Sequence, residues 1–221
     1  MKKIKYSEIT PEKIYKNRRS FIKSLGYGAS SLAVATIPFA SQTQADDRNE
    51  LTSYKDITTY NNYYEFGTSK SDPYVNSQNF KTSPWTISIE GEVQKPIKIS
   101  MEEITETFVS EERIYRLRCV EGWSMVIPWM GFSLNKLLSK VNPTSKAKYV
   151  EFESVYDPEQ MKGQRYPVLN WPYKEGLRID EAMHPLTTVV TGLYGKKLPN
   201  QNGAPLRIFI PWKYGFKSAK A

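Results

Sequence analysis

Side chains that commonly bind metals through sulfur or imidazole are scarce, because the chain of 221 residues has one cysteine and one histidine. The single cysteine, Cys119, excludes an internal disulfide, and it excludes an iron–sulfur cluster, which needs several thiolates. The chain also has no Cys-x-x-Cys-His run, which excludes covalent attachment of a c-type haem. Cys119 is therefore either an inert buried thiol or a residue kept for chemistry, and ligation to a metal would protect its sulfur from oxidation.

Several sequence features that mark other protein classes are also missing. No glycine-rich loop follows a predicted strand, so the dinucleotide-binding and P-loop classes lose their support. No internal repeat or low-complexity tract is present. The apolar segment 25–40 is interrupted by glycine and serine, and it is too short for a comfortable membrane span.

The first 45 residues have the features of an export signal. Residues 17–23 read Asn-Arg-Arg-Ser-Phe-Ile-Lys, a twin-arginine pattern, and residues 43–45 offer a small-residue cleavage site after the apolar segment. An ordinary secretory signal and an N-terminal anchor are the alternatives. The twin-arginine pathway exports proteins that have already folded around a cofactor. We therefore expect a twin-arginine signal peptide over residues 1–45 and a protein located in the periplasm.

Removal of this signal peptide would also remove most of the positive charge. It holds eight lysines and arginines and two acidic residues, which leaves 23 of the 31 basic and 21 of the 23 acidic residues in 46–221. The resulting net charge of +2 lacks the excess of positive charge that is typical of nucleic-acid-binding proteins, so no nucleic-acid partner is expected. The length of this part is sufficient for one domain with a hydrophobic core.

Two short helices are predicted from their capping residues. Ser100 and Glu103 have the spacing of a capping box, so a helix is expected over residues 101–108. Ser133 is a candidate cap for a second helix over residues 134–140, which Asn-Pro at 142–143 should end.

The other elements are predicted from short segments of alternating hydrophobicity that prolines and glycines separate. Residues 46–83 are polar with weak periodicity, and we expect an extended or irregular arm that its aromatic residues keep ordered. The absence of a repeating strand–helix–strand rhythm favours the α+β class. Strands are expected at 85–90, 113–119, 148–155 and 206–210, and a helical turn is expected at 180–183.

The segment around Cys119 carries the most specific pattern. It reads Arg-Leu-Arg-Cys-Val-Glu-Gly-Trp-Ser-Met over 116–125 and continues as Ile-Pro-Trp-Met-Gly-Phe over 127–132. This segment resembles the molybdenum-cysteine segment of the sulfite oxidase superfamily. Within that superfamily, residues 17–220 are most similar to the catalytic subunits of the periplasmic protein-methionine-sulfoxide reductases. Further segments agree with the resemblance, namely 61–67, 159–161, 201–207 and 211–217.

The resemblance implies a molybdopterin-binding domain of the sulfite oxidase type over residues 46–221, with mixed β-sheets and short helices. It implies one molybdenum–molybdopterin cofactor per chain, in which Cys119 is the catalytic residue and supplies the protein thiolate to the metal. A thiolate is a soft ligand suited to a redox metal, and Arg116 and Arg118 would favour the deprotonated form. The implied cofactor contacts are Asn61, Tyr64, Glu65, Ser154, Asn202, Arg207, Ser218, Ala219 and Lys220.

The chemistry of these side chains suits a long polar cofactor that ends in a phosphate. Asn and Ser can both donate and accept hydrogen bonds at the pterin edges, whereas Arg207 and Lys220 carry the charge that a phosphate requires. Each has a simpler alternative. Asn61 and Asn202 can be turn residues, and Arg207 can be a solvated strand arginine.

The activity that the resemblance implies is oxygen-atom transfer from methionine sulfoxide residues of oxidised periplasmic proteins. Sulfite oxidases usually have a histidine where this chain has Asn202, which favours sulfoxide reduction over sulfite oxidation. Electrons would come from a membrane-embedded haem-binding subunit that draws on the quinol pool. A sulfite-oxidising enzyme and a pterin-binding protein without turnover remain the alternatives. The family's sequence continues beyond the position of Lys220, so the resemblance also implies that the C-terminal part of the domain is missing.

Overall fold

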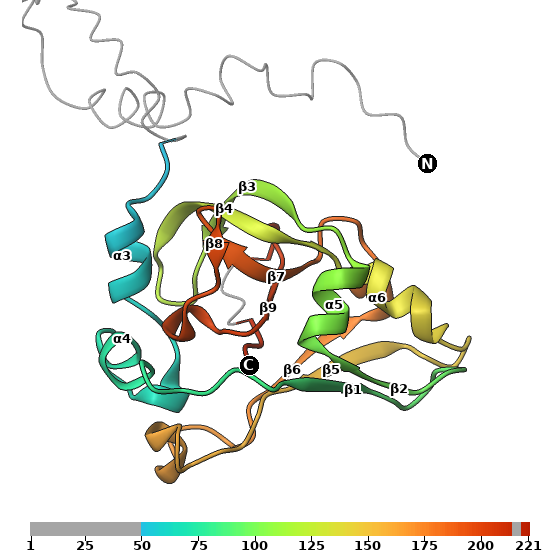
Figure 1. The fold of residues 1–221 in the computed structure, drawn as a ribbon, viewed down its shortest axis with the longest axis horizontal. Helices are drawn as coiled ribbons and strands as arrows, with labels where there is room; N and C mark the ends of the chain where they lie inside the picture. The colour runs from blue at the N-terminus through green and yellow to red at the C-terminus, as the bar shows by residue number, and fades with distance from the viewer. Residues whose placement is uncertain (1–49, 214–217) are drawn as a thin grey trace, which may run out of the picture. The chain divides into compact units, whose positions relative to one another are not determined.

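The computed structural model describes residues 50–213 and 218–221. The predicted signal peptide, residues 1–45, lies outside the described residues, as do residues 214–217. In the described part, short helices pack around antiparallel strands (Figure 1). None of the helices in this part has the length and apolar character that a membrane-spanning segment requires.

Residues 50–83 form short helical segments, so the prediction of an extended or irregular arm was wrong in part. Ser53 begins the first of these helices, because its hydroxyl accepts a hydrogen bond from the amide of Asp56 at 3.1 Å. The arm is ordered by aromatic packing, in which the Phe66 ring lies 5.0 Å from the Tyr63 ring and 5.4 Å from the Phe80 ring. The segments are α3 (Tyr54–Thr59), η3 (Tyr64–Phe66) and α4 (Asp72–Asn76).

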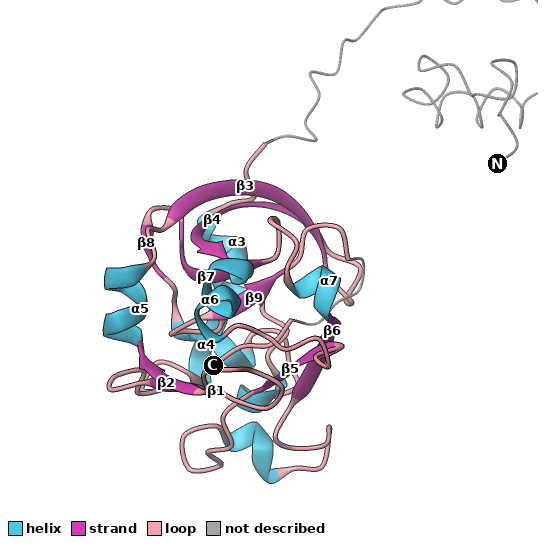
Figure 2. Ribbon diagram, turned by 90° about the vertical axis from the view of Figure 1, so that its right-hand side faces the viewer, coloured by secondary structure: helices cyan, strands magenta, loops and turns pink. Residues whose placement is uncertain are grey.

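In the part of the chain that the structure describes, the main sheet has five strands. They pair in the order β3, β4, β7, β8, and β9 also pairs with β7. Strand β3 and strand β4 form a long hairpin that curves over the rest of the sheet (Figure 2). Strand β7 pairs with β4 only from Trp129 to Ser133, so the other half of the hairpin extends beyond this pairing. The strands are β3 (Glu111–Arg118), β4 (Ser124–Ser133), β7 (Thr188–Leu193), β8 (Lys196–Lys197) and β9 (Arg207–Phe209).

Two smaller hairpins and three further helices complete the described fold. The hairpins pair β1 with β2 and β5 with β6. In Figure 1 these hairpins lie below the main sheet, and helices α5 and α6 lie to the right of the main sheet. The remaining elements are β1 (Thr86–Ile89), β2 (Ile97–Ser100), α5 (Met101–Thr107), α6 (Leu134–Val141), β5 (Tyr149–Glu153), β6 (Lys174–Arg178) and α7 (Ile179–Ala182), with 3-10 turns η4 (Lys162–Arg165) and η5 (Asn200–Asn202). The predicted α+β class is confirmed by this arrangement.

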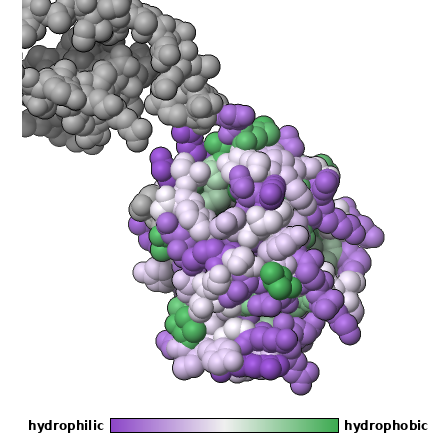
Figure 3. Space-filling model, turned by 90° about the vertical axis from the view of Figure 1, so that its left-hand side faces the viewer, coloured by the Kyte–Doolittle hydropathy of each residue, from purple (hydrophilic) through white to green (hydrophobic). Residues whose placement is uncertain are grey.

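The two faces of the main sheet are buried in different hydrophobic clusters. On one face Phe132 stacks on Phe108 with ring centroids 4.4 Å apart, among residues of α5 and α6. On the other face Trp129 packs 5.3 Å from Phe209, among residues of β3, β7 and β9. Because alternate residues of a strand point to opposite faces, the part of β4 over residues 127–133 is buried on both sides. On the surface that Figure 3 shows, hydrophilic residues predominate and hydrophobic ones are scattered.

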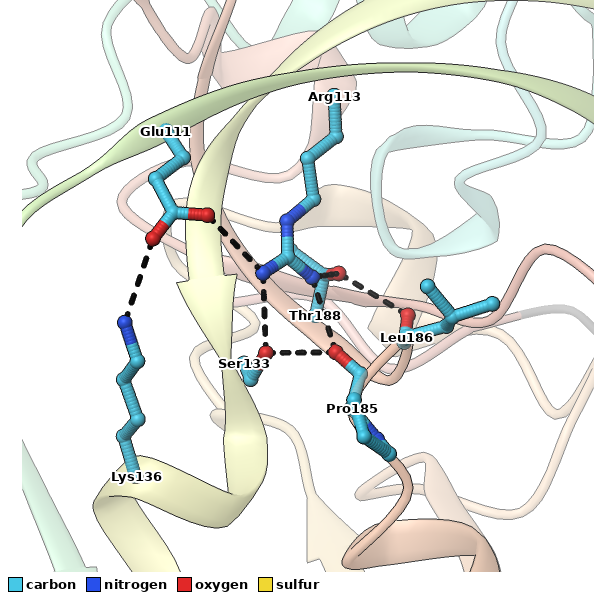
Figure 4. A network of polar contacts seen from close by, with 7 residues as sticks. All are labelled: Glu111, Arg113, Ser133, Lys136, Pro185, Leu186 and Thr188. Carbon is cyan, nitrogen blue, oxygen red and sulfur yellow. Dashed lines mark hydrogen bonds and ion pairs between the residues drawn. The ribbon is translucent and has the colours of Figure 1, made fainter.

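A network around Arg113 holds the open end of the β3–β4 hairpin (Figure 4). The guanidinium of Arg113 donates hydrogen bonds to the hydroxyls of Ser133 and Thr188 at 3.0 and 3.2 Å and to the carbonyl of Pro185 at 3.0 Å. The Ser133 hydroxyl itself donates to the Pro185 carbonyl at 2.6 Å. Ser133 therefore precedes α6 without capping it through its side chain, contrary to the prediction.

Gly131 offers a test of how closely β4 and β7 approach. A Cβ atom at this position would overlap the carbonyl oxygen of Val189, whereas a Cβ at Gly176 in β6 would have no atom within 4 Å. We expect Gly131→Ala to lower the free energy of unfolding by about 1–3 kcal/mol because the strands must move apart. The matched variant Gly176→Ala should change it by less than about 0.5 kcal/mol. Urea unfolding followed by tryptophan fluorescence measures both, and equal effects would contradict the close approach.

Candidate active site

Cys119 lies in a tight turn that joins β3 to β4. Its amide donates to the carbonyl of Trp123 at 3.0 Å, and the amide of Gly122 donates back to the Cys119 carbonyl at 2.9 Å. Gly122 has φ of +79°, a left-handed conformation that glycine adopts without strain. The turn thus holds the half-buried thiol of Cys119 at the end of the hairpin opposite the Arg113 network.

A small cavity of about 50 Å³ adjoins the Cys119 side chain. Its walls come from the arm, the β3–β4 hairpin, the turn before β9 and the last described residues, which are far apart in the sequence. Of the predicted site residues, those that line this cavity are Asn61, Cys119, Asn202, Arg207, Ser218 and Lys220. The fold therefore brings most of the predicted cofactor contacts to one place around the predicted metal ligand.

The other predicted contacts do not line this cavity. The Ser154 hydroxyl donates to the Lys220 carbonyl at 2.7 Å, and the Ala219 carbonyl accepts from the amide of Ile208 at 3.0 Å, so both hold the segment that carries Ser218 and Lys220. Tyr64 and Glu65 lie on η3. Glu65 is 1% exposed, and the Tyr64 hydroxyl is 3.5 Å from a carboxylate oxygen of Glu121.

Two asparagine side chains of the site share one backbone acceptor. The amide nitrogens of Asn61 and Asn202 both donate to the carbonyl of Ile57, at 3.0 and 2.9 Å. Their Oδ1 atoms are buried and have no hydrogen-bond partner among the described residues. A buried acceptor left without a partner is unfavourable by about 1–3 kcal/mol, so these oxygens suit a ligand that carries N–H groups.

Arg207 is a buried cation beside the same cavity. One terminal nitrogen donates to the Asn202 carbonyl at 3.2 Å, and the guanidinium lies 5.1 Å from the centre of the Trp129 ring. Its Nε atom is buried and has no partner among the described residues. Burial lowers the pKa of Arg207 to about 10, an effect that Cys119 and Tyr63 partly oppose, so the side chain stays charged at neutral pH. The alternative of a solvated strand arginine is excluded.

Lys220 places a second cation near Arg207. Its ammonium lies 5.1 Å from the centre of the Tyr63 ring and donates to the Ser218 carbonyl at 3.3 Å. Burial, followed by the negative charge of Glu65, raises the pKa of the Tyr63 hydroxyl, which therefore stays protonated. Two cations at one small cavity favour an anionic ligand, as a phosphate-bearing cofactor provides.

Several residues of the cavity wall were not predicted from the sequence. They include Tyr60 and Asn62 beside Asn61, Gln201 beside Asn202, and Trp123, Met125 and Trp129 on the hairpin. All of these except Tyr60, which directly precedes residue 61, lie within the segments that carry the resemblance, so membership of those segments was a usable signal. A larger cavity of about 400 Å³ lies at η3 and η4, with walls that include Phe66, Asp72, Lys162 and Tyr166, and it is lined by none of the predicted site residues.

A family match and a similar solved structure indicate the class of protein to which this chain belongs. Residues 74–221 match the family described as oxidoreductase molybdopterin binding domain. This agrees with a site where two cations lie beside a thiol and two asparagine oxygens have no partner in the described part of the chain. The fold is similar to that of the sulfane dehydrogenase SoxCD from Paracoccus pantotrophus, with a TM-score of 0.54 and 12% identity over 87% of this chain and 55% of that chain. The protein is therefore a molybdopterin-binding oxidoreductase.

Sequence relatives narrow this class. The chain is 54% identical over 228 residues to the protein-methionine-sulfoxide reductase catalytic subunit MsrP of Xanthomonas axonopodis pv. citri, covering 97% of this chain and 71% of the relative. It is 50% identical over 232 residues to the MsrP of Burkholderia mallei, covering 97% of this chain and 70% of that relative. The chain belongs to the family of protein-methionine-sulfoxide reductase catalytic subunits, which confirms the family and the enzyme class predicted from the motifs.

Proposed function

We propose that this protein reduces methionine sulfoxide residues of periplasmic proteins at a molybdenum–molybdopterin centre bound through Cys119. The observation that carries the proposal is the convergence of Asn61, Asn202, Arg207 and Lys220 on the cavity beside the single cysteine. When bound, a molybdenum ion held by the pterin supplies the Lewis acidity and the redox capacity that oxygen-atom transfer requires.

The residues around the cavity divide the work of holding the cofactor. The Oδ1 atoms of Asn61 and Asn202 would accept hydrogen bonds from N–H groups of the pterin, because they have no partner among the described residues. Arg207 and Lys220 would bind the phosphate, the first as a planar fork and the second as a point charge. Cys119 would supply the thiolate ligand, a soft donor suited to a redox metal.

The reaction needs electrons from another protein. Reduction of one methionine sulfoxide consumes two electrons and two protons, breaks the sulfur–oxygen bond and releases methionine and water. The sequence holds no haem-attachment motif and only one cysteine, so a second redox centre bound by such residues is not expected in this chain. We infer that a membrane-embedded haem-binding subunit delivers the electrons from the quinol pool. The twin-arginine pattern supports export to the periplasm, where oxidised proteins would be the substrates.

The full chain, produced in a host that makes molybdopterin, should oxidise a reduced viologen dye when a peptide containing methionine sulfoxide is added. The expected product is the same peptide with methionine, identified by a 16 Da loss in mass. The same preparation should not reduce ferricyanide with sulfite. Dye oxidation without a sulfoxide-dependent product, or oxidation of sulfite instead, would reject the proposed activity. Fractionation of the host cells tests the periplasmic location.

A further inference from the structure

Lys70 contacts both the arm and the Cys119 turn. Its ammonium is 2.7 Å from a carboxylate oxygen of Glu121 and donates to the Tyr64 hydroxyl at 3.3 Å. Its backbone carbonyl accepts the amide of Asn61 at 2.8 Å. One residue therefore connects η3, the position of Asn61 and the turn that carries Cys119.

The Cys119 end of the hairpin receives little support from the main sheet. Pairing between β4 and β7 stops at Trp129, and Val120 in the turn is 54% exposed. Support at this end comes from the arm, since Thr52 exchanges hydrogen bonds of 3.0 Å with Val126 and Lys70 reaches Glu121. The opposite end of the hairpin has the partly buried Arg113 network instead (Figure 4).

The Lys70–Glu121 pair is better shielded than the ion pairs on the outer surface. Its side chains are 27% and 23% exposed, whereas those of Lys136 and Glu111 at the other end of the hairpin are 46% and 50% exposed. The ammonium also lies 4.7 Å from the centre of the Tyr64 ring. A pair that is partly removed from water attracts more strongly than an exposed one, so it can fix the position of a turn.

We propose that Lys70 is a positioning residue for the cofactor site, acting through Glu121 and Tyr64 to hold the Cys119 turn against the arm. The thiol of Cys119 and the amide of Asn61 then face the same cavity before the cofactor binds. Such preorganisation reduces the ordering that binding must otherwise impose. The consequence for turnover rests on the proposed function, whereas the effect on the turn does not.

Hydrogen exchange on the cofactor-loaded full chain tests this role. In Lys70→Met the amides of Cys119 and Gly122 should exchange roughly two- to fivefold faster, as expected for loss of a partly shielded ion pair. Molybdopterin should dissociate faster by a similar factor, and kcat should fall while KM for the sulfoxide peptide stays unchanged. Lys136→Met is the matched control, because it breaks an ion pair of the same hairpin away from the site. It should leave the exchange rates, the dissociation of molybdopterin and kcat unchanged.

Charge-preserving variants separate positioning from a general loss of stability. Lys70→Arg should retain parental exchange in the turn, and Lys70→Glu combined with Glu121→Lys should exchange more slowly than Lys70→Glu alone. Equal exchange in Lys70→Met and the parent, or equal acceleration in Lys136→Met, would overturn the proposal. Failure of sulfoxide reduction with the expected exchange pattern would reject the proposed function and leave the role of Lys70 intact.

Discussion

Replacing Cys119 with serine should abolish turnover and remove most of the bound molybdenum. Cys119 is the only cysteine of the chain, and it faces the cavity where the predicted cofactor contacts meet. Replacement of a residue that merely supports a metal ligand already reduces affinity or activity about 10–100-fold, so loss of the ligand itself should cost at least roughly a hundredfold. Metal analysis by mass spectrometry and the viologen assay measure the two effects.

Val120→Ser is the matched control for this experiment. It introduces the same residue one position further along the turn, at a side chain that is 54% exposed and does not line the cavity. Molybdenum content and activity should stay at parental levels. X-ray absorption should detect one sulfur neighbour fewer around the metal in Cys119→Ser than in the parent. Parental molybdenum content and parental activity in Cys119→Ser would remove the ligand assignment.

Replacing Arg207 with methionine should release molybdopterin and leave the fold intact. The guanidinium is buried, its Nε has no partner within residues 50–213 and 218–221, and burial lowers its pKa to about 10. Both observations are expected for a charge that a bound anion would stabilise. A charge-assisted hydrogen bond to a phosphate contributes about 1.5–3 kcal/mol, so cofactor affinity should fall roughly 10–100-fold. The cofactor-free variant should unfold at the same temperature as the cofactor-free parent or higher, because an apolar side chain of similar length needs no desolvation.

Arg178→Met provides the control for Arg207→Met. Arg178 ends β6, its side chain is 64% exposed, and it pairs with Asp180 at 2.8 Å on the surface. Neither cofactor content nor the unfolding temperature should change appreciably, since exposed pairs contribute little. Calorimetry and fluorescence of the released pterin measure the two quantities. A large drop in the unfolding temperature of cofactor-free Arg207→Met, with cofactor affinity unchanged, would assign Arg207 to the core instead.

Elements with strong local signals were predicted well from the sequence. The helix expected at 101–108 is α5, and Ser100 caps it by accepting a hydrogen bond from the amide of Glu103 at 3.1 Å. The strand expected at 85–90 corresponds to β1. Both depend on residues next to one another in the chain, where capping and alternation are visible.

Elements decided by tertiary packing were missed. Strand β4 contains Pro128 and is buried on both faces over residues 127–133, so it shows neither a typical strand composition nor alternation. The cap expected from Ser133 was lost because Arg113, from a distant part of the sequence, takes its hydroxyl into another network. Such competition for one hydroxyl is not visible in a local pattern.

The candidate site was predictable from the resemblance more than from local chemistry. Local chemistry alone does not distinguish a metal ligand from an inert thiol at Cys119, and the prediction depended on the pattern of residues 116–132 together with the other matching segments. The convergence of Asn61 with Asn202 is a property of the fold, because both bind the carbonyl of Ile57. Lys70 carried no signal, since a lysine in a polar loop usually faces solvent.

The shared carbonyl of Ile57 limits how the chain can change in length. Because both amides are anchored to one oxygen atom at the end of α3, an inserted or deleted residue between Ile57 and Asn61 would displace one anchor relative to the other. The loop between β1 and β2 does not line the cavity, so a change of length there would leave both anchors in place. The number of residues between Ile57 and Asn61 should therefore be preserved among homologues more strictly than the identity of the residues between them.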